Sequence, residues 1–216
     1  MTTNQFSNGE ALRFGWNATR ANLAPLLMIG AAGVVLSILS QALTRAGGGG
    51  ALLGLVVQLA QLAMTLLLTR AALRIYDGAP VDLSQPTPLL QGYWGFVFTM
   101  FIYGIAATIG LALLIVPGVL LALAFGFAPL LTADGQTDPV EAFRVSSRLT
   151  RGSRGQLFGL WLLLVSVNLL GVLALGVGVV VTVPMSALAV VYAFRHLQGR
   201  TEAATPHVPS LTPRAV

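Results

Sequence analysis

The sequence contains no cysteine and no lysine, and few of its residues carry any charge. The absence of cysteine excludes disulfides, thiol chemistry and metal sites built on cysteine. Only 9% of the 216 residues are charged, against about 25% in typical soluble domains, while 56% are hydrophobic. Mean hydropathy is +0.82. This composition indicates an integral membrane protein, with no room left for a separate soluble catalytic domain.

Four long stretches carry no Lys, Arg, Asp or Glu. They hold 24, 24, 51 and 40 residues, at 21–44, 46–69, 83–133 and 155–194. A bilayer core about 30 Å thick needs about 20 helical residues for each crossing, so the stretches predict one, one, two and two crossings. We therefore expect an all-α polytopic membrane protein whose six transmembrane helices form three hairpins. The expected spans are about 23–43, 51–75, 93–115, 119–133, 157–175 and 179–197.

Proline and glycine mark the expected turns and kinks. Pro117 and Gly118 are expected to form the turn that splits the 51-residue stretch, because proline lacks a donor and glycine accepts positive φ. Pro129 and Pro184 are expected to kink the fourth and sixth spans. The fourth span is short for a full crossing, so it would thin the bilayer locally or begin within it.

The arginines are divided unequally between the two sides of the expected membrane. With six spans, eleven arginines fall on one side and Arg45 alone on the other. Because positive residues concentrate on the cytoplasmic side, we expect both termini there. Residues 1–197 would form one membrane domain, followed by a disordered cytoplasmic tail at 198–216. The net charge of +5 is spread beside apolar segments, so we expect the lipid bilayer, with anionic phospholipids, and no nucleic acid as the partner.

Two amphipathic segments precede pairs of spans. Residues 7–20 and 138–151 share five identities in fourteen positions at an offset of 131. Each begins with an N-cap residue, Ser7 or Asp138, and has glutamate three positions later, which predicts a capping box. Pro139 falls at the first helical position, where its fixed φ is suitable. We expect two interfacial helices that lie flat on the cytoplasmic surface of the membrane.

The arginines of these segments are the candidate lipid-headgroup residues. Arg144, Arg148 and Arg151 share one side of the second helix, and Arg13 and Arg20 share one side of the first. Arginine binds phosphate in a bidentate manner, so these side chains are expected to contact lipid phosphates. The alternative is that they only set the topology and bind no particular lipid.

A row of polar residues crosses the second span. Gln58, Gln61 and Thr65 lie on one helical face, and Asn168 lies in the fifth span. Such side chains usually form hydrogen bonds with another helix. A polar pathway or substrate groove is the alternative, but no ionisable residue lies mid-span, which favours packing.

Catalysis finds little support in the sequence. His196 lies at a span end and His207 in the C-terminal tail, and neither has neighbours at metal-ligand spacing. A hydrolytic cluster of Asp134, Asp138 and Glu141 is the remaining alternative. We therefore expect no enzyme activity, no cofactor and no metal site.

Several short motifs together resemble a known family. They are Leu114-Ile115-Val116-Pro117-Gly118, Phe127-Ala128-Pro129, Glu141-Ala142-Phe143-Arg144 and Leu149-Thr150-Arg151-Gly152. From about Glu10 to Leu197 the chain resembles the bacterial glycerophosphoryl diester phosphodiesterase membrane domain family and its uncharacterised stand-alone, six-span relatives. The resemblance implies a bacterial cytoplasmic (inner) membrane location. In fused relatives a soluble barrel carries the phosphodiesterase chemistry, and its acidic and histidine residues have no counterpart here.

Two classes of function remain open. The leading hypothesis is a non-enzymatic membrane scaffold or lipid-associated module, and the alternative is a small permease or transporter subunit. A second copy of the chain or other membrane proteins are the further partners considered. A cavity lined by Gln58, Gln61 and Asn168 would favour transport, whereas a closed, apolar interior would favour the scaffold.

Overall fold

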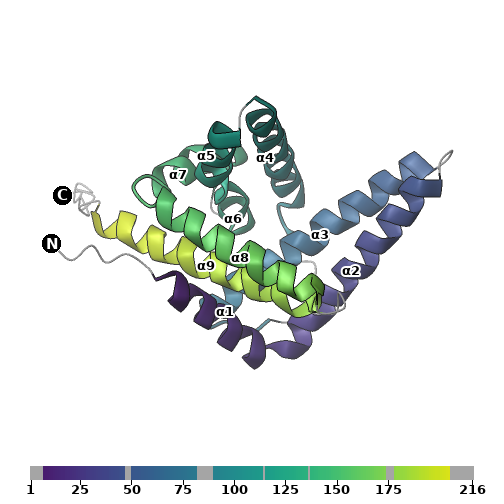
Figure 1. Ribbon diagram of the computed structural model, residues 1–216, viewed down its shortest axis with the longest axis horizontal. Helices are drawn as coiled ribbons and strands as arrows, with labels where there is room; N and C mark the ends of the chain where they lie inside the picture. Colours follow the sequence, from purple (N-terminus) through teal and green to yellow (C-terminus); the bar gives the residue numbers. More distant parts are fainter. Residues whose placement is uncertain are drawn as a thin grey trace, which may run out of the picture.

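The computed structural model describes residues 7–46, 50–81, 90–113, 115–135, 137–173 and 178–204 (Figure 1). Within these ranges the chain is helical and contains no strand, so the expected all-α class is confirmed. The helices are α1 (Asn8–Ala21), α2 (Leu23–Ala46), α3 (Gly50–Tyr76), α4 (Tyr93–Leu113), α5 (Ile115–Phe125), α6 (Ala128–Ala133), α7 (Pro139–Leu149), α8 (Arg154–Leu173) and α9 (Val179–Ala204).

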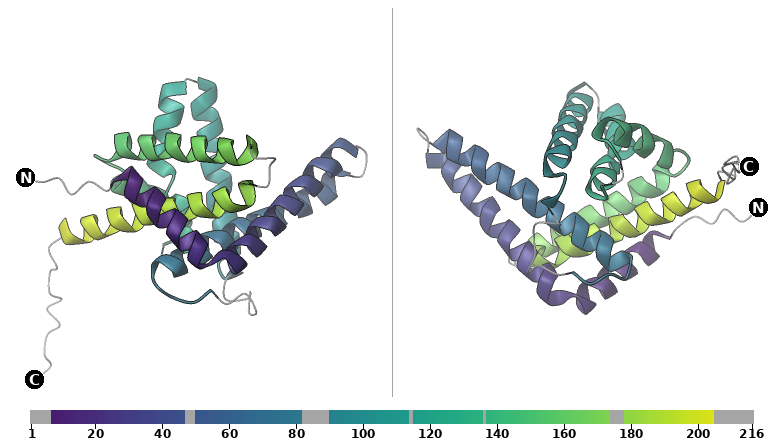
Figure 2. Two further views of the ribbon diagram at one scale, coloured as in Figure 1. Left: turned by 60° about the horizontal axis from the view of Figure 1, so that its bottom comes forward. Right: turned by 180° about the vertical axis from the view of Figure 1, so that it is seen from behind.

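Among consecutive helices in the described ranges, α2 packs most extensively with α3 and α4 with α5, and α8 with α9 and α6 with α7 also pack together, so the expected division into three hairpins stays a prediction. The first pair forms a long arm that projects from the rest of the molecule (Figures 1 and 2). Within the described ranges five helices are long and apolar enough to cross a membrane, which is typical of a multi-pass membrane protein. They are Leu23–Leu43, Leu52–Tyr76, Tyr93–Gly110, Arg154–Leu173 and Val179–Gly199.

The expected fourth span is interrupted. α5 ends at Phe125, and α6 begins with Pro129 in its first turn. Pro129 has no N–H to donate to the carbonyl of Phe125, so a continuous helix would lack a hydrogen bond there. The expected kink is thus a break between two short helices. Helix length therefore supports five crossings, because the apolar segment Gly118–Ala133 is shorter than the other five, and the sixth crossing stays a prediction.

Ser146 of α7 compensates for this break. Its hydroxyl donates to the carbonyl of Ala124 at 2.8 Å and accepts from the backbone N–H of Phe127 at 3.2 Å. Ser146 is fully buried. Buried backbone groups need a partner wherever a helix is interrupted. α7 is therefore part of the packed structure, because it satisfies backbone atoms that the end of α5 leaves free.

Pro117 and Gly118 do not form the expected turn. α5 begins at Ile115, so both residues lie in its first turn, where proline is tolerated because the first N–H groups of a helix have no intrahelical acceptor. Gly118 allows close packing of α4 and α5 instead. A Cβ added to Gly110 would lie 2.9 Å from the Cα of Gly118. Gly118 therefore serves close helix packing, at a position where the sequence predicts a turn.

α9 runs through Pro184 as one helix. Because proline has no N–H, the carbonyl of Val180 lacks its usual helical donor. Gly30 of α2 packs against this carbonyl, and a Cβ on Gly30 would lie 2.9 Å from it. The expected kink at Pro184 stays a prediction. α2 approaches α9 closely at this position.

The core surrounds α9, which contacts α1, α2, α3, α7 and α8. Leu188, Val191 and Phe194 of α9 are fully buried, as are Leu66 of α3 and Phe96 of α4. α9 continues to Ala204. Residues 198–204, the first part of the expected tail, are therefore helical, and the boundary of the membrane domain at residue 197 stays a prediction. Residues 205–216 lie outside the described residues.

α1 lies along α9 (Figure 2). One face, with Ala11, Gly15, Ala18 and Thr19, is buried. Gly15 is required for this contact, because a Cβ there would lie only 2.5 Å from a backbone carbonyl of α9. The segment expected to lie flat on the membrane is thus a helix with one face packed against the protein, and the opposite face, with Arg13 and Trp16, is exposed.

The starts of α1 and α7 fall where the sequence predicts. Ser7 and Asp138 are the N-cap residues, and Pro139 is the first residue of α7. Neither N-cap side chain makes a capping hydrogen bond, so the predicted capping boxes were wrong. In α7, Glu141 instead accepts a hydrogen bond from Arg148 at 2.6 Å.

Candidate functional site

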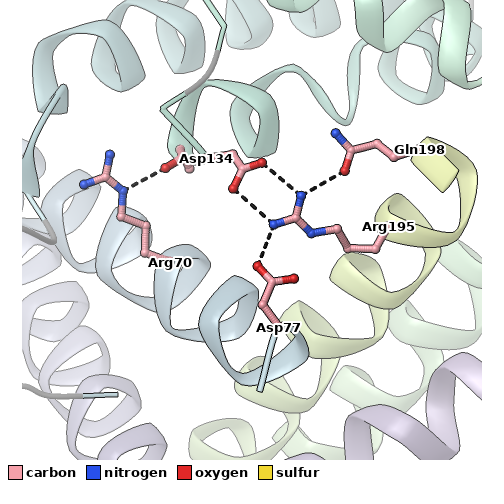
Figure 3. Close-up of polar contacts among 6 residues, drawn as sticks. Arg70, Asp77, Asp134, Arg195 and Gln198 are labelled. Atoms are coloured by element: carbon pink, nitrogen blue, oxygen red, sulfur yellow. Dashed lines mark hydrogen bonds and ion pairs between the residues drawn. The ribbon is translucent and has the colours of Figure 1, made fainter. Parts of the chain in front are cut away.

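Three charged side chains meet where the ends of α3 and α6 face α9 (Figure 3). Arg195 donates to the two carboxylate oxygens of Asp134 at 3.0 and 3.2 Å, and to Asp77 at 2.7 Å. The side chains of Arg195 and Asp134 are 19% and 13% exposed, whereas that of Asp77 is 46% exposed. We call these three residues the arginine clasp, because one guanidinium joins three helices.

Local sequence explains why the clasp forms. Asp77 and Asp134 each follow the last residue of a helix, and Arg195 lies within the apolar α9. A cation in such a helix needs a partner, since an isolated charge in apolar surroundings is strongly unfavourable. Gln198, one turn later in α9, accepts a further hydrogen bond from Arg195 at 3.0 Å. The guanidinium is thus surrounded by acceptors from both its own helix and its neighbours.

Arg70 of α3 lies beside the clasp (Figure 3) and donates hydrogen bonds to two backbone carbonyls. Its Nε donates to the carbonyl of Ala133 at 2.8 Å, and its Nη2 donates to the carbonyl of Gln91 at 2.6 Å. Ala133 is the last residue of α6, and a cation near the last carbonyls of a helix is favourable. Arg70 therefore ties the end of α6 and the start of α4 to α3.

A cavity of about 540 Å³ adjoins the clasp. Arg74, half-buried and one turn after Arg70, lines it and makes no hydrogen bond or ion pair with any residue in the described ranges. The cavity therefore presents a guanidinium that no described side chain neutralises. The residues around it are Arg70, Leu73, Arg74, Asp77, Gln91, Gly92, Ala133, Asp134 and Gly135.

The outer face of α7 carries the predicted headgroup arginines. Arg144, Arg148 and Arg151 are exposed and line one surface pocket of about 560 Å³. Glu141 lies among them, 2.6 Å from Arg148 and 3.6 Å from Arg144. The rings of Phe125 and Phe143, in edge contact at 5.5 Å, form an apolar wall of the same pocket. We call this pocket the α7 basic surface.

α1 carries a smaller basic surface. Arg13 and Arg20 are both exposed, on the face turned away from α9. The guanidinium of Arg20 lies over the ring of Trp16 at 5.7 Å from its centroid, in a cation–π contact. Tryptophan beside arginine is typical of the membrane–water interface. All five arginines that the sequence singles out are thus exposed: four lie on the amphipathic helices α1 and α7, and Arg151 lies in the turn that follows α7.

The polar residues of the long helices point to different neighbours. Gln58 lines a groove between α3 and α4, Gln61 lies near Gly33 of α2, and Asn168 donates to Ser186 of α9 at 2.7 Å. Thr65 donates back to the carbonyl of Gln61 in its own helix at 3.0 Å. Whether these side chains serve packing or a pathway stays a prediction.

The residues considered for hydrolysis are divided between two places. Asp134 belongs to the clasp, whereas Glu141 belongs to the α7 basic surface and pairs with arginines there. His196 stacks on Tyr192 at 6.3 Å. No group of three or more His, Asp or Glu side chains suited to a metal ion occurs within the described ranges.

The sequence reasoning missed the clasp and the role of Ser146. A signal for the clasp was present: Arg195 interrupts an apolar run, and Asp77 and Asp134 both end apolar segments on the same expected side of the membrane. A charge inside an apolar helix calls for a partner on that side. No sequence signal identified Ser146, because its partners are backbone atoms exposed by a break 19 residues away.

Comparison with known proteins gives distant relatives in mycobacteria. The uncharacterised protein Rv2560 of Mycobacterium tuberculosis is 26% identical over 238 aligned positions, which cover 90% of this chain and 69% of that protein. The uncharacterised protein Mb2590 of Mycobacterium bovis has the same identity and coverage. No family model and no solved structure matches the chain. The relatives are similar over most of their length, but their names assign no activity.

Proposed function

We propose that this protein is a non-enzymatic, lipid-associated membrane scaffold whose basic helices α1 and α7 contact anionic phospholipids. The observation that carries the proposal is the α7 basic surface. Its arginines are exposed on α7 and in the turn directly after it, and the opposite face of α7, with Ala142, Ser146 and Leu149, is buried in the protein. Such a helix holds its cations at a fixed depth beside the apolar helices, where phosphate groups of a bilayer would lie.

The membrane location is supported by the exposed faces of the long helices. These faces carry large apolar side chains in continuous rows, far beyond the scattered ones of a soluble surface. On α8 they include Trp161, Leu162, Val165, Leu169, Leu170 and Leu173. We assign the protein to the bacterial cytoplasmic membrane, as the resemblance to the glycerophosphoryl diester phosphodiesterase membrane domain family implies; that resemblance stays a prediction.

The orientation follows from the arginines. In this proposal α5 and α6 complete a sixth crossing, and both termini lie in the cytoplasm. Supporting it, Arg45 lies one residue before the end of α2, at the far end of the α2–α3 arm (Figure 1). The arginine clasp and the α7 basic surface both lie away from that end. A concentration of arginine on one side is the usual mark of the cytoplasmic face.

Substitutions of Glu141 and of its neighbouring arginines test the lipid proposal, because they should change lipid affinity in opposite directions. Replacing Arg144, Arg148 and Arg151 together by glutamine should weaken phosphatidylglycerol binding about tenfold, since each arginine near an anionic surface contributes ~1 kcal/mol and Glu141 already offsets part of that. Glu141→Gln should strengthen binding about twofold to fivefold, because it frees two guanidinium groups. Native mass spectrometry in detergent, comparing phosphatidylglycerol with phosphatidylcholine, measures both effects.

The matched control is Arg45→Gln, which removes one exposed arginine at the end of the arm. It should leave phosphatidylglycerol binding unchanged. Equal binding by wild type and the triple variant, or weaker binding by Glu141→Gln, would contradict a phosphate-binding role for α7. The arginines would then serve topology alone.

A permease or transporter subunit is the alternative class. It would use a shared cavity lined by Gln58, Gln61 and Asn168, open to one side. These side chains face three different neighbours in the described part of the chain, which favours the scaffold.

A further inference from the structure

A second feature suited to lipid lies between α3 and α4. The two helices are joined near the start of α4, where the hydroxyl of Tyr93 donates to the carbonyl of Leu59 at 2.6 Å and Arg70 donates to Gln91. Beyond this point they diverge (Figure 1). The space between them is a groove of about 900 Å³. Unlike α4 and α5, which pack closely, α3 and α4 leave an open apolar groove between them.

The walls of this groove are almost wholly apolar. Trp94 and Phe101 are 71% and 66% exposed. Gln58 and Thr108 are its polar side chains, and the hydroxyl of Thr108 already donates to the carbonyl of Gly104 at 2.8 Å. Both helices are long and apolar enough to cross a membrane. A hydrocarbon chain would therefore match the walls, apart from the amide of Gln58.

The polar end of the groove leads toward the cavity that Arg74 lines. Gly92 borders the cavity and Trp94, two residues on, borders the groove. On α3, Arg70 borders the cavity and Leu62 borders the groove. These two residues are eight positions apart, which is about 12 Å along a helix. That spacing is within the length of one phospholipid, from its phosphate into its acyl chain.

The charges around the cavity favour an anion. Two arginines (Arg70 and Arg74) and two carboxylates (Asp77 and Asp134) line it. Arg195 does not line the cavity but pairs with both carboxylates, so these five described groups together carry one net positive charge. Both carboxylates are bound by Arg195, so they do not neutralise Arg74. An apolar helix of a second copy would fill the groove but leave this guanidinium unpaired, whereas a phospholipid supplies both the chain and the charge.

We infer that α3 and α4 form a binding site for one anionic phospholipid, with its phosphate on Arg74 and an acyl chain in the groove. This inference rests on the proposed membrane function but uses residues separate from the α7 basic surface. The site differs from general contact with the bilayer because it requires a fixed guanidinium and a fixed groove at the same time.

Two glycines allow a clean test of the groove. A Cβ at Gly104 or at Gly54 would have no atom within 4 Å, so neither glycine is held by a close contact at its Cα. Gly104 lines the groove and Gly54 does not. Gly104→Phe should therefore fill the groove, while Gly54→Phe makes the same chemical change elsewhere on a membrane helix.

Native mass spectrometry gives the readout, as the fraction of purified protein that carries phosphatidylglycerol at a set lipid concentration in detergent. Gly104→Phe should reduce this fraction about tenfold through loss of acyl-chain burial. Arg74→Gln should reduce phosphatidylglycerol affinity about fivefold and leave phosphatidylcholine unaffected. Gly54→Phe should match wild type, and circular dichroism checks that every variant is folded.

Several results would overturn the inference. Unchanged binding in Gly104→Phe would leave at most a headgroup or free-phosphate contact at Arg74, and competition by inorganic phosphate would identify the latter. A change of oligomeric state in Gly104→Phe without loss of lipid would assign the groove to a second copy. If the α7 triple variant alone lost phosphatidylglycerol, the proposed function would stand and the α3–α4 site would be rejected.

Discussion

Replacing Arg195 by methionine is expected to lower the free energy of unfolding by about 2 to 4 kcal/mol, because it leaves a largely buried carboxylate without its cation. Asp134 is 13% exposed and has both oxygens bound by Arg195. The effect should fall below that of a fully buried pair, since Asp77 is half-exposed and can be solvated. Titration with sodium dodecyl sulfate in detergent micelles measures the loss.

The clasp also predicts that a second substitution, at Asp134, restores the stability lost in Arg195→Met. A double variant, Arg195→Met with Asp134→Leu, should regain most of the loss, because replacing a buried ion pair by apolar side chains is often neutral. Arg45→Met, at an exposed arginine, should change stability by less than about 0.5 kcal/mol. If Arg195→Met matched Arg45→Met, the clasp would have no role in holding α3, α6 and α9 together.

Gly15→Ala is expected to detach α1 from α9. The added Cβ would lie 2.5 Å from the carbonyl oxygen of Met185 and 3.3 Å from the Cβ of Ala189. Because the near atom belongs to the backbone, the helices must move apart, at a loss of about 1 to 3 kcal/mol. Hydrogen exchange of the α1 amides and the free energy of unfolding both report this change.

Gly9→Ala in the same helix is the matched control. Its Cβ would meet only the hydroxyl of Ser7, at 3.6 Å. Glycine to alanine inside a helix normally stabilises it by up to about 1 kcal/mol. Opposite signs at the two positions are therefore expected, and a stabilising Gly15→Ala would show that α1 does not depend on close contact with α9.

The sequence was informative where one local rule decides the structure. Charge-free stretches located the long helices, since few sequences of that length avoid charge unless they cross a membrane. Asp138 and Pro139 located the start of α7 because an N-cap residue followed by proline has few other uses. The period of the arginines placed Arg144 and Arg148 on one exposed face.

The sequence was less informative where distant segments decide the structure. Pro129 predicts a disturbance, but a break rather than a kink depends on Ser146 of α7, which satisfies the freed backbone groups. Gly118 could have served a turn or a close contact, and only its position against Gly110 separates the two. The clasp likewise joins residues up to 118 positions apart, which local patterns do not report.

The relatives and the structure agree on how far function can be assigned. The mycobacterial proteins are similar to this chain over 90% of its length but carry no named activity. Of the residues that the sequence offered for hydrolysis, Asp134 and Glu141 are bound in ion pairs with arginine, and Asp138 is the N-cap residue of α7.

Cysteine labelling tests the membrane arrangement most directly, and the natural absence of cysteine makes each single variant unambiguous. Arg45→Cys and Arg148→Cys would be placed separately in right-side-out vesicles and exposed to a membrane-impermeant maleimide. Position 45 should react in sealed vesicles, and position 148 should react only after they are opened. Reaction of both positions from the same compartment would contradict the proposed six crossings and the cytoplasmic location of the α7 basic surface.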